Sequence, residues 1–128
     1  MLQEFLRGAV QLHVLHHACE GEIHGAWMSQ ELARHGHRIS PGTLYPLLHR
    51  MEAAGLVTSR RDTVAGKVRR VYAATQAGRE ELAATREALR ELAAEVLTGD
   101  EPGSQTTVAD SGDADAENPP ATRTFSPS

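Results

Sequence analysis

Hydrophobic residues recur at helical spacing between Ser40 and Glu52, in the segment SPGTLYPLLHRME. At about 100° per residue, the apolar side chains share one arc and polar side chains face away from it. This arc contains Leu44, Leu47, Leu48 and Met51. Ser40 can cap the helix and Pro41 suits its first position, whereas Pro46 removes a backbone hydrogen bond, so we expect a kink or local opening there. The pattern predicts a helix that packs with one face and can bind with the other.

A shorter amphipathic pattern precedes this helix, and two strand-like runs follow it. Residues 25–35 place Trp27, Met28 and Leu32 at helical spacing, with Gly36 as a stop signal. Residues 56–61 and 68–75 read as strands around a turn that contains glycine, which predicts a hairpin with a loop of about four or five residues. This order is that of a winged helix-turn-helix, in which residues 40–52 form the recognition helix.

The two ends of this region predict further helices with apolar contact faces. The N-terminal helix begins with apolar residues on one side, and the last helix follows Thr75, a candidate cap, and continues to about Leu97. Apolar residues recur in that last helix with the spacing of a short two-stranded seam, although a helix folded back on its own subunit is the alternative. The predicted dimer contacts are Leu2, Leu6, Leu82, Leu89, Leu92 and Val96.

Several of these segments resemble the PadR-like family of transcriptional regulators, over roughly residues 5–97. The matching positions are Gly8, the Ile23-His24-Gly25 turn, residues 40–52, Gly55-Leu56-Val57, and Arg69-Arg70-Val71-Tyr72 leading to Thr75 and Gly78. The resemblance implies a mainly α fold with a small β-hairpin, a winged helix-turn-helix with N-terminal and C-terminal dimerisation helices. It also implies a homodimer, usually a repressor, whose ligand pocket, where there is one, lies near the dimer interface.

Composition divides the chain into three parts. We expect a DNA-binding winged helix-turn-helix in residues 1–75, a dimerisation helix in residues 76–97, and a disordered acidic tail in residues 98–128, which is rich in Gly, Pro, Ser, Thr and Asp. The net charge of −4 argues against binding to nucleic acid. Residues 38–70, however, contain seven Lys or Arg and only two acidic residues, Glu52 and Asp62. This local basic excess favours contact with phosphates.

A twofold dimer would place two recognition helices in successive major grooves of a pseudo-palindromic operator. Arg50 could bind guanine or a phosphate, and Tyr45 and Thr43 could contact the DNA backbone or a thymine methyl group. The basic side chains of the hairpin could bind phosphates. The candidate DNA contacts are Ser40, Thr43, Tyr45, His49, Arg50, Lys67, Arg69 and Arg70. A winged-helix interaction module without DNA binding is the alternative.

The N-terminal helix ends in an unusual group of histidines. His13, His16, His17 and Glu20 share an arc of about 100°. Neutral imidazoles and a carboxylate suit zinc, cadmium or a similar divalent ion, so we expect no required cofactor but a candidate metal effector. A pH-sensitive or merely polar interface is one alternative, and a phenolic or drug-like organic effector is another. His35 and His37 flank a glycine, where solvent exposure is the usual role.

Other classes of protein find little support in the sequence. No apolar run reaches the roughly 18–20 residues of a membrane span, so we expect a cytoplasmic protein. Cys19 is the single cysteine and is expected to be a small buried hydrophobic residue. The sequence shows no Ser/His/Asp order, phosphate loop or paired-carboxylate motif, so an enzyme is not expected.

Overall fold

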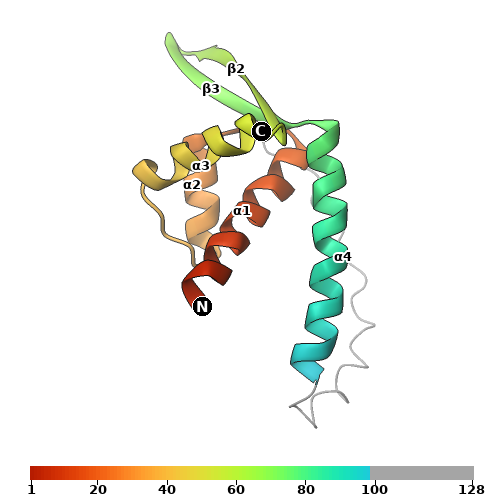
Figure 1. Cartoon of the computed structure of the whole chain (residues 1–128). Helices are drawn as coiled ribbons and strands as arrows, with labels where there is room; N and C mark the ends of the chain where they lie inside the picture. The colour runs from red at the N-terminus through yellow and green to blue at the C-terminus, as the bar shows by residue number, and fades with distance from the viewer. Residues whose placement is uncertain (99–128) are drawn as a thin grey trace, which may run out of the picture. The chain divides into compact units, whose positions relative to one another are not determined.

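The computed structural model describes residues 1–98, so the acidic tail predicted after that point lies outside the described residues. The elements in chain order are α1 (Leu2–Glu20), β1 (Ile23–His24), α2 (Gly25–Arg34), α3 (Pro41–Ala53), β2 (Val57–Val64), β3 (Lys67–Ala74) and α4 (Gln76–Thr98) (Figure 1). This mainly helical fold with a small antiparallel sheet confirms the predicted fold class. Residues 1–82 form one compact unit, and residues 83–98 are the described part of a second.

The core of the first unit lies between α1, α2, α3 and the sheet. Met28 and Leu32 of α2, Val14 of α1 and Tyr72 of β3 are almost completely buried, and Cys19 is half-buried against them. The whole apolar arc predicted for α3 is also buried, namely Leu44, Leu47, Leu48 and Met51. Full burial of a leucine-sized side chain contributes about 1.5–3 kcal/mol. Core packing therefore fixes which face of α3 remains available.

Helix α3 begins as its sequence predicts but does not break at its internal proline. Ser40 occupies the cap position, where its carbonyl oxygen accepts hydrogen bonds from the backbone N–H groups of Thr43 and Leu44, both at 2.9 Å. Its hydroxyl lies 3.4 Å from the hydroxyl of Thr43 and makes no side-chain cap. The helix continues without interruption through Pro46, where a kink or local opening is expected from the sequence. Burial of the leucines that follow Pro46 holds the helical turn in place.

Strands β2 and β3 form a tight hairpin that projects from the helices of its unit (Figure 1). The pairing extends from Val57 opposite Ala74 to Val64 opposite Lys67, so only Ala65 and Gly66 form the loop. Their φ angles of 54° and 79° are both positive, as a two-residue turn requires to match the twist of the strands. The predicted loop of four or five residues is therefore wrong.

A third strand, which the sequence does not predict, completes the sheet. Strand β1 pairs antiparallel with β3, Ile23 opposite Tyr72 and His24 opposite Val71, and the strand order is β1-β3-β2. The ring nitrogen Nδ1 of His24 also accepts a hydrogen bond from the backbone N–H of Trp27 at 3.4 Å, which caps α2. The segment thus joins the wing to the first helix of the helix-turn-helix.

The start of α4 is hydrogen-bonded to the two residues that precede β2. The backbone N–H of Thr75 donates to the Leu56 carbonyl at 3.0 Å, and its hydroxyl donates to the Gly55 carbonyl. The same hydroxyl accepts from the backbone N–H of Gly78 at 3.0 Å, so Thr75 caps α4 as predicted. One turn later, Leu82 is 5% exposed and belongs to the core of its own subunit. Leu82 thus has little surface left for the predicted contact with a second subunit, which stays a prediction.

The second unit is described here by the remainder of α4. Leu89, Leu92 and Val96 are 43%, 51% and 58% exposed, and Arg90 pairs with Glu87 at 3.0 Å. The predicted seam residues of this unit thus present apolar surface, and their pairing with a second copy stays a prediction. No helix within residues 1–98 is both long enough and apolar enough to span a bilayer.

Candidate nucleic-acid interface and histidine cluster

The outer face of α3 carries the predicted base-contacting residues. Thr43, Tyr45, His49 and Arg50 are all exposed, whereas the leucines of the same helix are buried. The ring of Tyr45 lies against Gly25, where an added Cβ would come within 2.7 Å of the tyrosine Cε1 atom. The missing side chain at the start of α2 therefore makes room for the ring. Sequence reasoning did not find this contact, although Gly25 belongs to the matched turn.

The hairpin presents the predicted phosphate-binding residues on its surface. Lys67 is exposed at the turn, Arg69 lies 3.5 Å from a carboxylate oxygen of Asp62, and Arg70 donates to the Ser59 hydroxyl at 3.2 Å. Ser59 in turn donates from its hydroxyl, at 2.8 Å, and its backbone N–H, at 3.1 Å, to one oxygen of Glu52. These bonds connect the base of the wing to the last turn of α3.

Arg60 has a different partner and does not extend this basic surface. Its guanidinium donates two hydrogen bonds to the carboxylate of Glu22, at 2.7 and 2.8 Å. This pairing lowers the pKa of Glu22 and raises the pKa of Arg60. A guanidinium that makes two short hydrogen bonds to one carboxylate is less able to attract phosphate. Arg69 has a single, longer contact with Asp62, at 3.5 Å, so Lys67, Arg69 and Arg70 remain the stronger candidates.

A groove of about 480 Å³ lies between α1 and the entrance to α3. Its apolar lining includes Leu6, Val10 and Leu47, and its polar lining includes Arg7 and Arg50. The remaining lining residues are Gln3, Gly8, Gln11, Gly36, His37, Arg38, Ile39 and Thr43. An apolar floor with several cationic side chains can hold a small organic anion. Two of the lining side chains, Thr43 and Arg50, also belong to the predicted DNA-contacting face.

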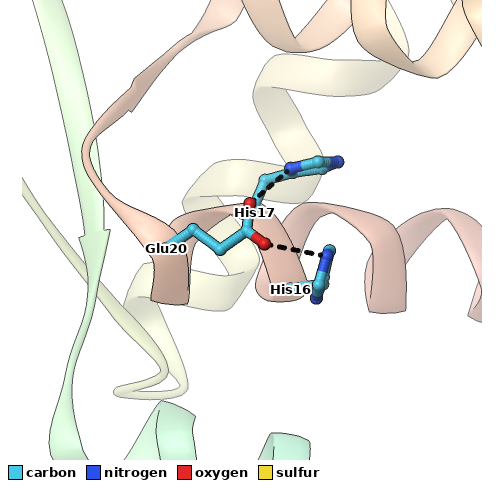
Figure 2. A group of neighbouring side chains, drawn as sticks. All are labelled: His16, His17 and Glu20. Carbon is cyan, nitrogen blue, oxygen red and sulfur yellow. Dashed lines mark hydrogen bonds and ion pairs between the residues drawn. The ribbon is translucent and has the colours of Figure 1, made fainter. Parts of the chain in front are cut away.

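Three of the four predicted metal ligands gather at the end of α1. Figure 2 shows Glu20 between His16 and His17, with one carboxylate oxygen 3.3 Å from His16 Nε2 and the other 3.3 Å from His17 Nδ1. One ligand atom from each residue lies within 4.8 Å of the others. Two imidazoles and a carboxylate at this spacing can bind a divalent transition-metal ion.

The fourth predicted ligand, His13, lies with a different group. Its ring centre is 5.0 Å from that of His35 and 5.3 Å from that of His37, but 6.3 Å from that of His17. Burial, followed by repulsion from His35, His37, His17 and His16, lowers the pKa of His13. The structure therefore divides the predicted four-residue site, and it brings both histidines of the turn after α2 to His13.

A buried carboxylate, not found by sequence reasoning, connects the two groups. Glu31 is 9% exposed, and its Oε2 atom lies 3.5 Å from His17 Nε2 and 3.2 Å from His35 Nε2. Its other oxygen accepts a hydrogen bond from Arg34 at 2.8 Å. Trp27 makes an edge-to-face contact with His17, with the two ring centres 5.3 Å apart. The only sequence signal was a glutamate on the core-facing side of α2, close to Met28 and Leu32.

A helix-turn-helix with an exposed polar face, followed by a basic hairpin, defines a winged-helix transcriptional regulator. Residues 14–84 match the family described as "Transcriptional regulator PadR-like family". Over 98 residues the chain is 61% identical to transcriptional regulator Rv3488 of Mycobacterium tuberculosis, covering 77% of this chain and 92% of that protein. The chain belongs to the PadR-like family of transcriptional regulators.

Solved structures agree with this assignment. A PadR family transcriptional regulator from Eggerthella lenta has a TM-score of 0.67 at 32% identity, with 75% of this chain and 85% of that chain covered. A PadR-like transcriptional regulator from Bacillus cereus has a TM-score of 0.64 at 25% identity, with coverages of 86% and 97%. The family and the winged-helix fold predicted from the sequence are confirmed, and the relatives are transcriptional regulators rather than enzymes.

Proposed function

We propose that the protein is a dimeric, sequence-specific DNA-binding repressor that an effector releases from its operator. The observation that carries this proposal is the exposed polar face of α3 in the same compact unit as the basic hairpin. Regulators of the PadR-like family bind DNA, and α3 occupies the position of a recognition helix. No acidic side chain interrupts its outer face between Ser40 and Arg50.

Each exposed residue of α3 has a chemistry suited to one part of the DNA. Arg50 can bind guanine through two parallel hydrogen bonds or pair with a phosphate. Thr43 and Tyr45 can contact a thymine methyl group or the backbone, and Lys67 and Arg69 can neutralise phosphates. A twofold dimer would read two half-sites roughly 34–36 Å apart, about one turn of the double helix.

The dimer itself is proposed from apolar surface that the single chain leaves uncovered. Leu2 and Leu6 of α1 are 66% and 37% exposed, and Leu89, Leu92 and Val96 of α4 are all more than 40% exposed. A small winged-helix unit has a modest core, so covering such side chains with a second copy adds stability. Burial of each would contribute about 1.5–3 kcal/mol at most.

A divalent metal ion is the first candidate effector. His16, His17 and Glu20 already lie within coordinating distance of one another, and zinc or cadmium accepts nitrogen and carboxylate ligands of this kind. The ion is proposed as a signal and not as a cofactor that the fold requires. A phenolic or similar organic acid is the second candidate, because the groove beside α3 combines an apolar floor with Arg7, Arg38 and Arg50.

The decisive experiment measures binding of the purified protein to DNA from just upstream of its own gene. Parallel samples contain EDTA, zinc, cadmium or a phenolic acid. Arg50→Ala should weaken binding about 5–150-fold, since a good guanine or phosphate contact contributes about 1–3 kcal/mol. Arg90→Ala removes the same charge from α4, outside the first unit, and serves as the matched control.

The outcome separates the candidate functions. A specific complex released by metal supports the metal effector, and one released by the phenolic acid supports the groove. A complex that resists every addition keeps the DNA-binding proposal but removes both effectors. If no complex forms even at low salt, the winged helix is an interaction module without DNA binding.

A further inference from the structure

We propose that the groove between α1 and the entrance to α3 binds an aliphatic carboxylate, and that this ligand excludes DNA by direct competition. The proposal rests on the function proposed above, in which an effector releases the protein from its operator. It goes further because it names the chemical class of the ligand and the surface for which ligand and DNA compete. The described residues that line the groove all belong to the first compact unit.

The charge of the groove selects an anion. Arg7 of α1, Arg38 of the connection before α3 and Arg50 of α3 all line it, and no Asp or Glu does so among the described residues. All three side chains are exposed, and none of them takes part in an ion pair within residues 1–98. A guanidinium binds a carboxylate through two parallel hydrogen bonds. The groove can therefore take up a carboxylate without breaking an ion pair of this part of the chain.

The apolar part of the groove suits a hydrocarbon chain better than a flat ring. Leu6 and Val10 of α1, Ile39 and Leu47 supply aliphatic side chains. No Phe, Tyr or Trp is among the described lining residues, so an aromatic ligand would find none of these rings to stack on. The volume of about 480 Å³ falls within the range of small-molecule sites. An aliphatic carboxylate of medium length matches both the charge and the lining.

The position of the groove makes its ligand a competitor of DNA. Thr43 and Arg50 line the groove and are also candidate contacts for the major groove of DNA. A carboxylate bound to Arg50 occupies the guanidinium that would otherwise bind guanine or a phosphate. Its negative charge also repels phosphates that approach α3. Binding of the ligand and binding of DNA then exclude each other, and release needs no movement of α3.

Gly8 offers a way to fill the groove without altering a candidate DNA contact. This residue lies on α1 and lines the groove, and a Cβ added there meets nothing within 4 Å. Leucine and alanine are both better helix formers than glycine. Gly8→Leu should therefore fold and place its side chain where the ligand binds. Gly8→Ala is the matched control, because it gains the same helix propensity with much less bulk.

Calorimetry on the full chain, with octanoate, decanoate and decylammonium as probes below their micelle concentrations, tests the ligand class. Decanoate should bind more tightly than octanoate, by up to about 15-fold, since each buried methylene contributes about 0.8 kcal/mol. Decylammonium, with the same chain and the opposite charge, should bind about tenfold more weakly or not at all. Gly8→Leu should bind decanoate about tenfold more weakly than the parent, whereas Gly8→Ala should stay within about threefold.

DNA binding measured by fluorescence anisotropy, in EDTA to remove metal ions, tests the competition. The apparent Kd for operator DNA should rise in proportion to the decanoate concentration. An allosteric effector would instead bring the apparent Kd to a plateau set by its coupling free energy. Gly8→Leu should bind DNA as the parent does and resist release by decanoate.

Several results would overturn the proposal. Equal decanoate affinity in Gly8→Leu and the parent would place the ligand elsewhere, and tighter binding of benzoate than of decanoate would reject the aliphatic class. A plateau in the apparent Kd would reject competition. Leu6 is also a predicted dimer contact, so sedimentation of Gly8→Leu is measured as well, and a loss of the dimer would assign the groove to a second copy.

Two controls separate this proposal from other causes. Circular dichroism of Gly8→Leu and Gly8→Ala shows whether each variant keeps the parent's helix content. If the parent fails to bind DNA even without decanoate, the proposed function fails and competition fails with it. Calorimetry would still decide whether the groove binds an aliphatic carboxylate.

Discussion

Replacement of Gly78 by alanine should destabilise the protein, although alanine is the better helix former. Gly78 lies in the first turn of α4 and is buried. A Cβ added there would lie 3.1 Å from the carbonyl carbon of Leu56, closer still to the carbonyl oxygen, and 3.3 Å from Leu15 Cδ1. The obstacle is mostly backbone, and backbone cannot rotate away as a side chain can.

The expected magnitude follows from three opposing effects. Alanine gains about 1 kcal/mol over glycine in a helix. Overpacking typically costs about 1–3 kcal/mol, and displacement of Leu56 also strains its 3.0 Å hydrogen bond from Thr75, which contributes about 1 kcal/mol. The net loss should be about 2 kcal/mol, or a fall in Tm of about 8–16 °C for a unit of this size.

Thermal unfolding followed by circular dichroism checks this value, at one protein concentration because a dimer's Tm depends on concentration. Gly42→Ala is the matched control, since Gly42 also lies in the first turn of its helix, α3. A Cβ there would meet only the Ser40 hydroxyl at an ordinary 3.6 Å. Its Tm should stay level or rise slightly. A Gly78→Ala protein that melts at or above the parent temperature would refute the packing argument.

Three further predictions concern the wing, the histidines and the seam. Loss of Lys67 or Arg69 should weaken binding to all DNA sequences alike and reduce the slope of log K against log salt by about 0.9 per lost phosphate contact. Fluorescence anisotropy at several salt concentrations measures this slope, and an unchanged slope would show that the wing does not contact DNA. The pKa of His13 is lowered from 6.5 by burial and by neighbouring histidines, so the unfolded chain takes up this proton first, and stability should fall as pH drops below about 6.5. Melts between about pH 7.5 and 5.5 should show this fall, and His13→Asn should reduce it. The double substitution Leu89→Glu, Leu92→Glu should give a monomer in sedimentation, with helix content unchanged in circular dichroism. A dimer that persists would reject the proposed pairing of α4 with a second copy.

The helices could be predicted from the sequence because their apolar spacing and end signals agree. Residues 40–52 show both, and the buried arc of α3 is the predicted one. The hairpin was recognisable, but its loop was not, because the positive φ of Ala65 is uncommon for alanine and is imposed by strand pairing. Strand β1 has only two residues, too few for any periodicity, and exists through its pairing with β3.

The candidate sites show a different limit of sequence reasoning. Helical spacing gives the direction of a side chain around its own axis but not the element that approaches it. His13 therefore joined the predicted group on α1, whereas the fold brings His35 and His37 to it. Leu82 shows the same limit, because a seven-residue repeat does not reveal that this residue packs in the core of its own chain. Such assignments need the tertiary contacts.

Helix α1 provides a physical connection between the proposed effector site and the recognition helix. Its residues Val10, Val14 and Leu15 are buried in the same core as Leu47 and the other apolar residues of α3. Close-packed cores transmit displacement because they contain little free volume to absorb it. An ion bound by His16, His17 and Glu20 at the end of this helix would therefore act on α3 through packing. A coupling free energy of about 1–3 kcal/mol, or about 5–150-fold in DNA affinity, is sufficient for regulation.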